Sequence, residues 1–258
     1  MSGHGRACPS LRARGSGQRR VSQETRGVLH ERIDGRASRG GQGAGVTRVL
    51  VVSPHPDDES IGCGGTLRRH VVRGDDVHVI HLTSGEQGGD GRPPHETARI
   101  RETEAEAAAA VLGLTQFEFW RQPDGAIRAT KHLVEQLRGS IERFRPRIIY
   151  VTHAREMHPD HRAAVRLVRQ SLSGLRSQTR APRVLTFEVW TPMQDMDEIV
   201  DISPYIETKM QAIRAHRSQC DIMRFDDAAL GLARYRGEMH LWPGGDYAEI
   251  FCELRPRS

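Results

Sequence analysis

The chain has 258 residues, of which 37% are hydrophobic and 28% are charged, and its formal net charge is +5. This length suits one large domain, and the absence of any long apolar run excludes a membrane-spanning helix. Residues 1–45 hold nine arginines against three acidic residues, so the rest of the chain carries a net charge of −1. The basicity therefore belongs to the N-terminal segment, and no nucleic-acid partner is expected for the folded part.

Residues 1–45 are rich in Gly, Arg and Ser and poor in large apolar residues. Such a segment cannot bury enough surface to offset its chain entropy, so we predict a disordered basic N-terminal tail before a folded domain at residues 46–258. The tail is either a basic tether for an acidic partner or a dispensable leader, and its lack of any motif favours the leader. The four cysteines form no CxxC pair and the start lacks the apolar stretch of a secretory signal, which predicts a cytoplasmic protein.

From residue 46 onward, β-branched apolar runs alternate with segments of helical pattern. In chain order they predict a strand (46–53), a helix (60–73), a strand (76–84), a Gly-rich loop (85–94), a helix (96–114), a strand (117–120), a helix (130–144), a strand (147–153), a helix (159–172), a strand (183–190), two helices (203–219 and 225–236) and a final strand (247–254). Strands that alternate with helices predict an α/β domain with a Rossmann-like, doubly wound and mostly parallel sheet.

Two clusters of acidic residues and histidines follow the first and the fourth predicted core strands: "HPDDE" at 55–59 and "HPDH" at 158–161. Ligands bind at the carboxyl ends of strands in an open parallel sheet, so we expect the clusters to converge at one crevice. A catalytic zinc ion keeps three protein ligands, and His55, Asp58 and one histidine of HPDH would supply such a set. Asp57 is then left beside the metal, where its carboxylate can take a proton from the attacking water.

Each cluster also has a purely structural interpretation. A pair of aspartates is most often a solvated turn or a helix cap, and a lone histidine is most often structural or exposed. Their common placement at strand ends favours a metal site over that interpretation. The glycines of "IGCGG" at 61–65 lack the GxGxxG spacing of a dinucleotide loop, so we predict that they allow close packing of the first helix, with Cys63 as a small buried residue.

The motif "PHPDDE" at 54–59, followed by Gly64 and Gly65, and the motif "HPDH" at 158–161 resemble those of the PIG-L/LmbE-like zinc N-deacetylases, which remove acetyl from N-acetylglucosaminyl groups. The resemblance covers about residues 46–254. Weaker matches lie at "TSGEQGG" (83–89), "IRETEAEAAAAVLGL" (100–114), "QPDG" (122–125) and "KMQAIRAHRSQ" (209–219). What the resemblance implies is a zinc-dependent hydrolase that removes an N-acetyl group from a small amino-sugar glycoside, such as a thiol precursor or an aminoglycoside or glycopeptide antibiotic intermediate.

The resemblance also implies roles for eight residues. One Zn²⁺ per chain would be held by His55, Asp58 and His161. Asp57 matches the general base, His158 matches the residue that stabilises the oxyanion and assists departure of the amine, and Asp160 matches the residue that orients His158. Two further residues match those that grip sugar hydroxyls, Arg101 and Asp124.

Competing functions stay open at this point. A non-catalytic sugar- or nucleotide-binding protein on the same fold would have degraded metal or base positions, and here they are intact. A chitin-type oligosaccharide ranks below the other substrates, because Trp120, Trp190 and Trp242 are scattered. Glu59 is expected to brace its loop or cap a helix, and Arg155 is expected at the surface, whereas His153 could be either a specificity residue or a surface residue. A homo-oligomer is left open.

Overall fold

The structure is a computed structural model that describes residues 45–175, 181–240 and 245–255. Contacts group these residues into one compact unit, which is built on a seven-stranded sheet of order β3-β2-β1-β4-β5-β7-β6. The predicted tail, apart from Gly45, lies outside the described residues. No helix in the described part of the chain combines the length and the hydropathy needed to cross a membrane.

The strands are β1 (Arg48–Ser53), β2 (Asp76–His81), β3 (Gln116–Phe119), β4 (Ile148–Thr152), β5 (Arg183–Phe187), β6 (Glu198–Asp201) and β7 (Ala248–Glu253). Strands β1 to β5 pair in parallel, whereas β7 runs antiparallel to both β5 and β6. The predicted α/β fold with a mostly parallel sheet is therefore confirmed.

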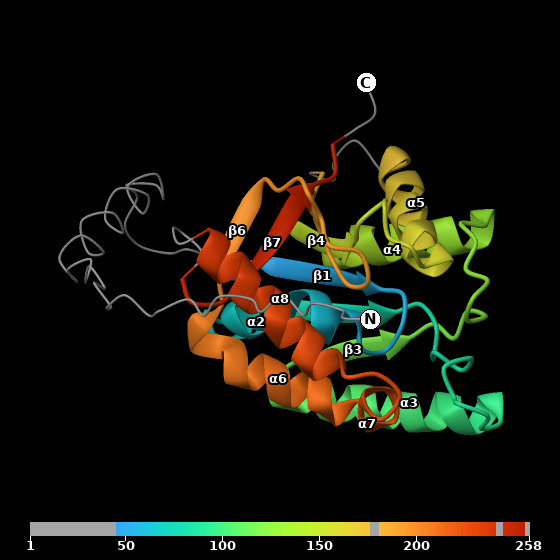
Figure 1. Cartoon of the computed structure of the whole chain (residues 1–258). Helices are drawn as coiled ribbons and strands as arrows, with labels where there is room; N and C mark the ends of the chain where they lie inside the picture. The colour runs from blue at the N-terminus through green and yellow to red at the C-terminus, as the bar shows by residue number, and fades with distance from the viewer. Residues whose placement is uncertain (1–44, 176–180, 241–244, 256–258) are drawn as a thin grey trace, which may run out of the picture. The chain divides into compact units, whose positions relative to one another are not determined.

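The helices are α2 (Asp58–Val72), α3 (Pro94–Leu112), α4 (Lys131–Phe144), α5 (Pro159–Ser173), η1 (Ser203–Tyr205), α6 (Ile206–Ala215), α7 (Arg217–Cys220) and α8 (Phe225–Met239). Figure 1 shows α4 and α5 on one side of the sheet and α2, α3, α6 and α8 on the other. Strand β1 illustrates how the sequence produces this arrangement, because alternate side chains of a strand point to opposite faces. Val49 and Val51 join the core under α2, α3 and α6, and Leu50 and Val52 join the core under α4 and α5.

The glycines of α2 let this helix lie close to the sheet. A Cβ on Gly62 would stand 2.2 Å from Cδ2 of Phe187 on β5, and one on Gly65 would stand 2.7 Å from Cβ of Ile202. Cys63 between them is fully buried. The close packing and the buried cysteine predicted from the sequence are both found.

The sequence-based prediction was wrong at two places near the C-terminus. Strand β6 was not predicted, because it has only four residues, and its two apolar residues between two acidic ones are too few to form a pattern. The helix predicted at 203–219 is divided into η1, α6 and α7. His216 ends α6 with non-helical backbone angles, φ −79° and ψ 60°, so the chain turns before α7 begins.

Candidate metal and catalytic site

The site lies where the strand order reverses. Strand β1 pairs with β2 on one side and with β4 on the other, so the chain leaves β1 and β4 at adjacent positions on the same edge of the sheet. Such a switch point is where ligands bind in doubly wound folds. The structure brings all eight predicted site residues to this one place: His55, Asp57, Asp58, Arg101, Asp124, His158, Asp160 and His161.

Asp58 lies between two histidines from the two clusters. Its Oδ2 is 3.1 Å from Nδ1 of His55, and its Oδ1 is 3.2 Å from Nε2 of His161. Burial alone would raise the pKa of Asp58, but the contacts with His161 and His55 hold that pKa well below its usual value. Burial likewise opposes protonation of His161, yet Asp58 and Glu156 raise its pKa to about 9. The cluster thus concentrates one carboxylate and two imidazoles in a buried space.

Two groups of side chains in the described part of the chain could hold a metal ion. One consists of His55, His158 and His161, and the other of His55, Asp124 and Asp160, with the ligand atoms of each group within 4.8 Å of one another. His161 is fully buried, and neither of its ring nitrogens makes a hydrogen bond. An imidazole without hydrogen bonds, surrounded by nitrogen and carboxylate donors, fits a metal such as zinc.

Asp57, the predicted base, occupies a strained position. Its φ of 126° lies where non-glycine residues are rare, and such backbone conformations cost on the order of 1–3 kcal/mol. In this conformation the carboxylate contacts Arg101, whose Nη2 donates to Asp57 Oδ2 over 3.0 Å. Burial raises the pKa of Asp57 to about 7, even though the charge of Arg101 acts in the opposite direction. A carboxylate with a pKa near neutrality suits proton transfer at physiological pH.

Arg101 reaches the site from α3 and is itself buried. Besides Asp57, it donates to the carbonyl oxygens of Pro56 and Gly85, over 2.8 and 2.9 Å. Gly85 leaves room for this guanidinium, because a Cβ there would stand 2.2 Å from Nη1 of Arg101. The arginine predicted to grip sugar hydroxyls therefore has Asp57 as its main partner.

His158 begins α5 and caps it. Its Nδ1 accepts a hydrogen bond from the backbone N–H of Asp160 over 3.3 Å, so a neutral ring carries its proton on Nε2. Burial and the neighbouring His55 and His161 lower the pKa of His158, which favours that neutral form. The ring stands edge-on to His55, with 4.7 Å between centroids.

The carboxylate of Asp160 has different partners from those predicted. It accepts hydrogen bonds from the backbone N–H groups of Gly125 and Ile127, over 2.7 and 3.0 Å, and lies 3.3 Å from Nε2 of His55. Asp160 thus orients His158 through its backbone and ties the loop that carries Asp124 to α5. Asp124 lies on that loop with Oδ1 3.0 Å from Nε2 of His55, and its pKa is about 2, because the contact with His55 outweighs burial.

Glu156 was missed by the sequence analysis. It is buried, with Oε2 3.6 Å from Nδ1 of His161, while its Oε1 accepts from the backbone N–H groups of Val189, Trp190 and Thr191. Glu156 therefore holds the ring of His161 from the side of Nδ1, as a carboxylate does when it orients a histidine that binds a metal. Its position five residues before His161 is the only signal that the sequence offers.

Three residues with lesser predicted roles are placed as follows. Glu59 is buried and accepts hydrogen bonds from the hydroxyls of Ser53 and Ser60, so it braces the loop after β1. His153 is also buried, with Nε2 2.7 Å from the carbonyl oxygen of Thr191. It does not line the cavity that opens in front of His55, Asp57 and His158. Arg155 is exposed and pairs with Asp195, as the surface interpretation predicted.

A cavity of about 380 Å³ opens in front of these residues. Its inner part is formed by the cluster side chains His55, Asp57, Asp58 and His158. The remaining lining comes from α2, α3, the loop after β2, the loop before α4, the segment after β5 and the segment from α7 to the start of α8: Ile61, Gln87, Gly88, Asp90, Arg101, Asp124, Gly125, Trp190, Gln219, Ile222, Met223 and Phe225. This volume suits a small molecule such as a sugar derivative.

Comparison with known proteins agrees with this architecture. The sequence model of the family described as "PIG-L: GlcNAc-PI de-N-acetylase" matches residues 50–172, which hold both clusters. Diacetylchitobiose deacetylase of Thermococcus kodakarensis is 31% identical over 221 residues, which cover 79% of this chain and 82% of that protein. The chain belongs to the PIG-L family.

A second relative is the 1D-myo-inositol 2-acetamido-2-deoxy-alpha-D-glucopyranoside deacetylase of Saccharomonospora viridis. It is 31% identical over 234 residues, and the alignment covers 67% of this chain and 85% of that protein. Among solved structures, the conserved protein TT1542 of Thermus thermophilus has a TM-score of 0.71 at 32% identity, over 81% of this chain and 95% of that chain. The alignments with these proteins thus extend over two thirds or more of the chain, and the family model alone includes every residue of the two clusters.

Proposed function

We propose that this PIG-L family member is a zinc-dependent hydrolase that removes the N-acetyl group from an N-acetylglucosaminyl-type amino sugar. One observation carries the proposal: a buried carboxylate with a pKa near 7, Asp57, lies beside a cluster of histidines and carboxylates at the floor of a sugar-sized cavity. The names of two relatives, which act on N-acetylated glucosamine derivatives, support the same reaction. Fold alone would not, because one fold serves many reactions.

We assign His55, Asp58 and His161 as the residues that hold the metal. When bound, zinc supplies Lewis-acid polarisation of the acetyl carbonyl and makes water a better nucleophile at neutral pH. Glu156 keeps the ring of His161 in place through the contact at its Nδ1. The ring of His158 also lies close to those of His55 and His161, which makes it the alternative to Asp58 as third ligand. The zinc content of variants at His158 and Asp58 distinguishes the two sets of ligands.

Asp57 acts as the general base in this proposal. It takes the proton from the water that attacks the acetyl carbonyl carbon, and Arg101 keeps the carboxylate pointed at the cavity. The Nε2–H of His158 donates to the oxygen that becomes negative as the tetrahedral intermediate forms. The proton that Asp57 took from the water then passes to the amide nitrogen, the C–N bond of the intermediate breaks, and the free amino sugar and acetate leave.

The proposal is tested by incubating the purified, zinc-loaded protein with a panel of N-acetylglucosaminyl compounds and measuring the released primary amine. The panel includes diacetylchitobiose and an N-acetylglucosaminyl-inositol, the substrate types in the names of the two relatives. We expect amine from at least one compound, loss of activity with a chelator and recovery with added zinc. No amine from any compound, with the metal loaded, would contradict the hydrolase and favour a sugar-binding protein.

A further inference from the structure

The cavity in front of the catalytic residues has two parts of different chemistry. The polar part is built by Gln87, Asp90, Arg101, Asp124 and Gln219. The apolar part is built by Ile61 and by four side chains from the segments after β5 and after α7, namely Trp190, Ile222, Met223 and Phe225. A sugar needs the first part for its hydroxyls. The second part needs another explanation, because it borders the same cavity and contributes nothing to the proposed reaction.

The apolar part is open to solvent. Of the eight exposed large hydrophobic side chains in the described part of the chain, three line this cavity: Trp190, Ile222 and Met223, which are 42%, 50% and 46% exposed. Another of the eight, Met157, does not line the cavity, but it directly precedes His158 in the chain and is 64% exposed. Exposed apolar side chains that gather at one place mark a binding surface, whereas scattered ones need no explanation.

This apolar surface begins at the reacting centre. The rings of His158 and Trp190 are 6.3 Å apart between centroids, and Trp190 in turn meets Phe225 edge-on at 5.9 Å. Ile61, Trp190 and Phe225 also line a neighbouring cavity of about 230 Å³, which continues toward Val189, Pro192 and Leu232. Glu188, Lys209 and Glu249 also line that cavity, but they are ion-paired within the fold, Glu188 with Arg236 and Lys209 with Glu249. A molecule whose amide lies at Asp57 can therefore extend along the apolar side chains of Ile61, Trp190 and Phe225.

The charges of the lining argue against an acidic group on that molecule. Among the described residues that line the cavity, Arg101 is the single arginine or lysine, and its guanidinium is already bound to Asp57 and to two carbonyl oxygens. Of the four aspartates in the same lining, Asp58 is assigned to the metal and Asp57 is paired with Arg101, which leaves Asp90 and Asp124 to face a substrate. Arg224 follows Met223, but it is paired with Asp227 over 2.6 Å and does not line the cavity. A carboxylate or phosphate on the substrate would meet these aspartates without a free cation to balance it.

We infer that the natural substrate carries its N-acetylated amino sugar on an uncharged, apolar aglycone, which packs against Trp190, Ile222, Met223 and Phe225. The inference rests on the proposed deacetylase function and adds the class of substrate. It separates this chain from enzymes that would act on sugars linked to anionic groups. A membrane surface or a second copy of the chain is the other kind of occupant for exposed apolar side chains, but either would cover the entrance that the sugar has to use.

The test compares three glycosides of N-acetylglucosamine that differ only in the aglycone: methyl, phenyl and 4-carboxyphenyl. The zinc-loaded protein is assayed for released amine, and kcat/KM is compared. We expect the phenyl glycoside to exceed the methyl glycoside by about tenfold or more, because its ring leaves water on the apolar wall. The 4-carboxyphenyl glycoside is expected to lose that advantage, since its carboxylate would leave water next to apolar side chains with no free cation to balance it.

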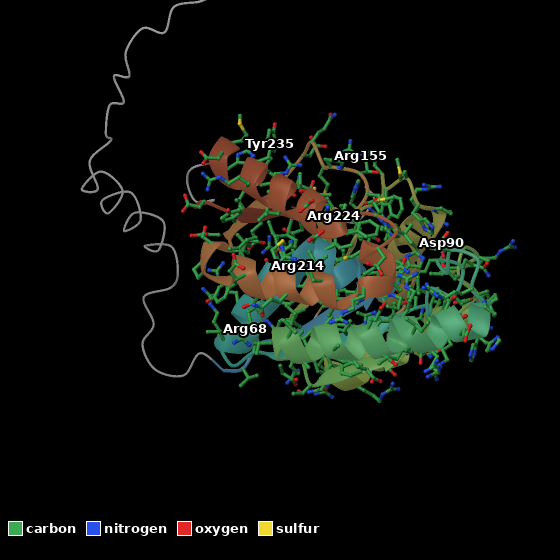
Figure 2. The ribbon with its side chains drawn as sticks, turned by 60° about the horizontal axis from the view of Figure 1, so that its bottom comes forward. Arg68, Asp90, Arg155, Arg214, Arg224 and Tyr235 are labelled. Carbon is green, nitrogen blue, oxygen red and sulfur yellow. The ribbon has the colours of Figure 1, made fainter. Side chains whose placement is uncertain are left out.

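Two variants link the preference to this surface. Met223→Ala and Trp190→Ala should each lower the ratio of phenyl to methyl kcat/KM several-fold. Met239→Ala is the matched control, because Met239 is 60% exposed at the end of α8 and does not line the cavity. Figure 2 shows how far apart the two ends of α8 lie: Tyr235 is near the C-terminal end, which carries Met239, and Arg224 directly precedes the N-terminal end, which borders the cavity. The control should leave the ratio unchanged.

The outcomes separate the two proposals. Amine from all three glycosides at equal kcat/KM, or a preference for the carboxylate, would overturn the apolar aglycone and leave the deacetylase in place. No amine from these glycosides or from any other N-acetylated sugar, in the presence of metal, would overturn both. A Met223→Ala protein with an unchanged ratio but altered sedimentation or vesicle binding would assign the surface to self-association or to a membrane, and would also overturn the inference.

Discussion

The guanidinium of Arg101 donates to Asp57 over 3.0 Å, and both side chains are buried. The two residues come from the loop after β1 and from α3, so their contact joins the proposed base to a helix at the rim of the cavity. Burial and the neighbouring Asp58 raise the pKa of Asp57, whereas Arg101 lowers it. The balance of these effects sets the pH at which the base is ionised.

Replacing Arg101 with methionine should therefore move the pH profile. Without the positive charge, the pKa of Asp57 rises above about 7, and the carboxylate is protonated at neutral pH. We expect kcat/KM at pH 7 to fall at least about tenfold, with the acid limb of the profile shifted to higher pH. Arg101→Lys keeps the charge and should shift that limb less. A loss of activity with an unmoved acid limb would assign Arg101 to substrate binding instead.

Asp57 and His161 should respond differently to removal. Asp57→Ala is expected to abolish amine release while zinc stays bound, because Asp57 takes a proton and is not an assigned ligand. His161→Ala should lose the metal itself, since His161 is fully buried at the centre of the cluster. Zinc content of the purified proteins, measured by atomic spectroscopy, distinguishes the two. A His161→Ala protein with zinc near the wild-type level would refute the ligand assignment.

Glu156 offers a test of the residues behind the metal. Glu156→Gln keeps an oxygen that can accept from the backbone of Val189, Trp190 and Thr191, but it removes the charge next to His161. We expect zinc affinity to fall about 10- to 100-fold with little change in stability. Glu156→Ala should also destabilise the fold by about 1–3 kcal/mol, because those buried N–H groups lose their partner. Competition with a chelator and urea denaturation measure the two effects, and equal zinc affinity in Glu156→Gln would contradict the role.

The parts of the site that the sequence could predict are local in the chain. His55, Asp57 and Asp58 follow one strand within a few residues, and His158 and His161 lie at the start of one helix, so residue types and spacing are enough to locate them. A parallel sheet then brings the two segments together. Strand β1 and its neighbours were also predictable from local sequence, because a run of β-branched apolar residues is typical of a buried strand.

The remaining parts depend on contacts between distant segments. Glu156 acquires its role only because the chain after β5 returns over it, with Val189 donating to its side chain. Trp190 and Met223 line the same cavity, although they come from segments that no sequence pattern links. For this reason Trp190 looked like one of three scattered tryptophans in the sequence. His216 fits a helical pattern, yet its backbone is not helical and the chain turns there between α6 and α7, which no local pattern indicates.

That same histidine predicts how stability depends on pH. His216 is buried, neither of its ring nitrogens makes a hydrogen bond, and burial lowers its pKa to about 4. In the unfolded chain its pKa is about 6.5, so between these values the unfolded state binds more protons than the folded state. Stability contributed by the neutral ring is therefore present above the unfolded pKa and is lost as the pH falls. The loss from this residue between pH 7 and pH 5 should be about 2 kcal/mol.

Replacing His216 with phenylalanine should remove this dependence. The variant keeps a ring of similar size and breaks no hydrogen bond, so the structure should tolerate it. Urea denaturation at pH 7 and pH 5 gives the free energy of unfolding for wild type, His216→Phe and the control His132→Gln, which removes an exposed histidine on α4. We expect the change between the two pH values to be about 2 kcal/mol smaller in His216→Phe and unaltered in the control. If His216→Phe loses as much stability on acidification as the wild type, then other groups whose pKa is lower in the folded than in the unfolded state cause the loss, and His216 is not the residue that makes the protein acid-sensitive.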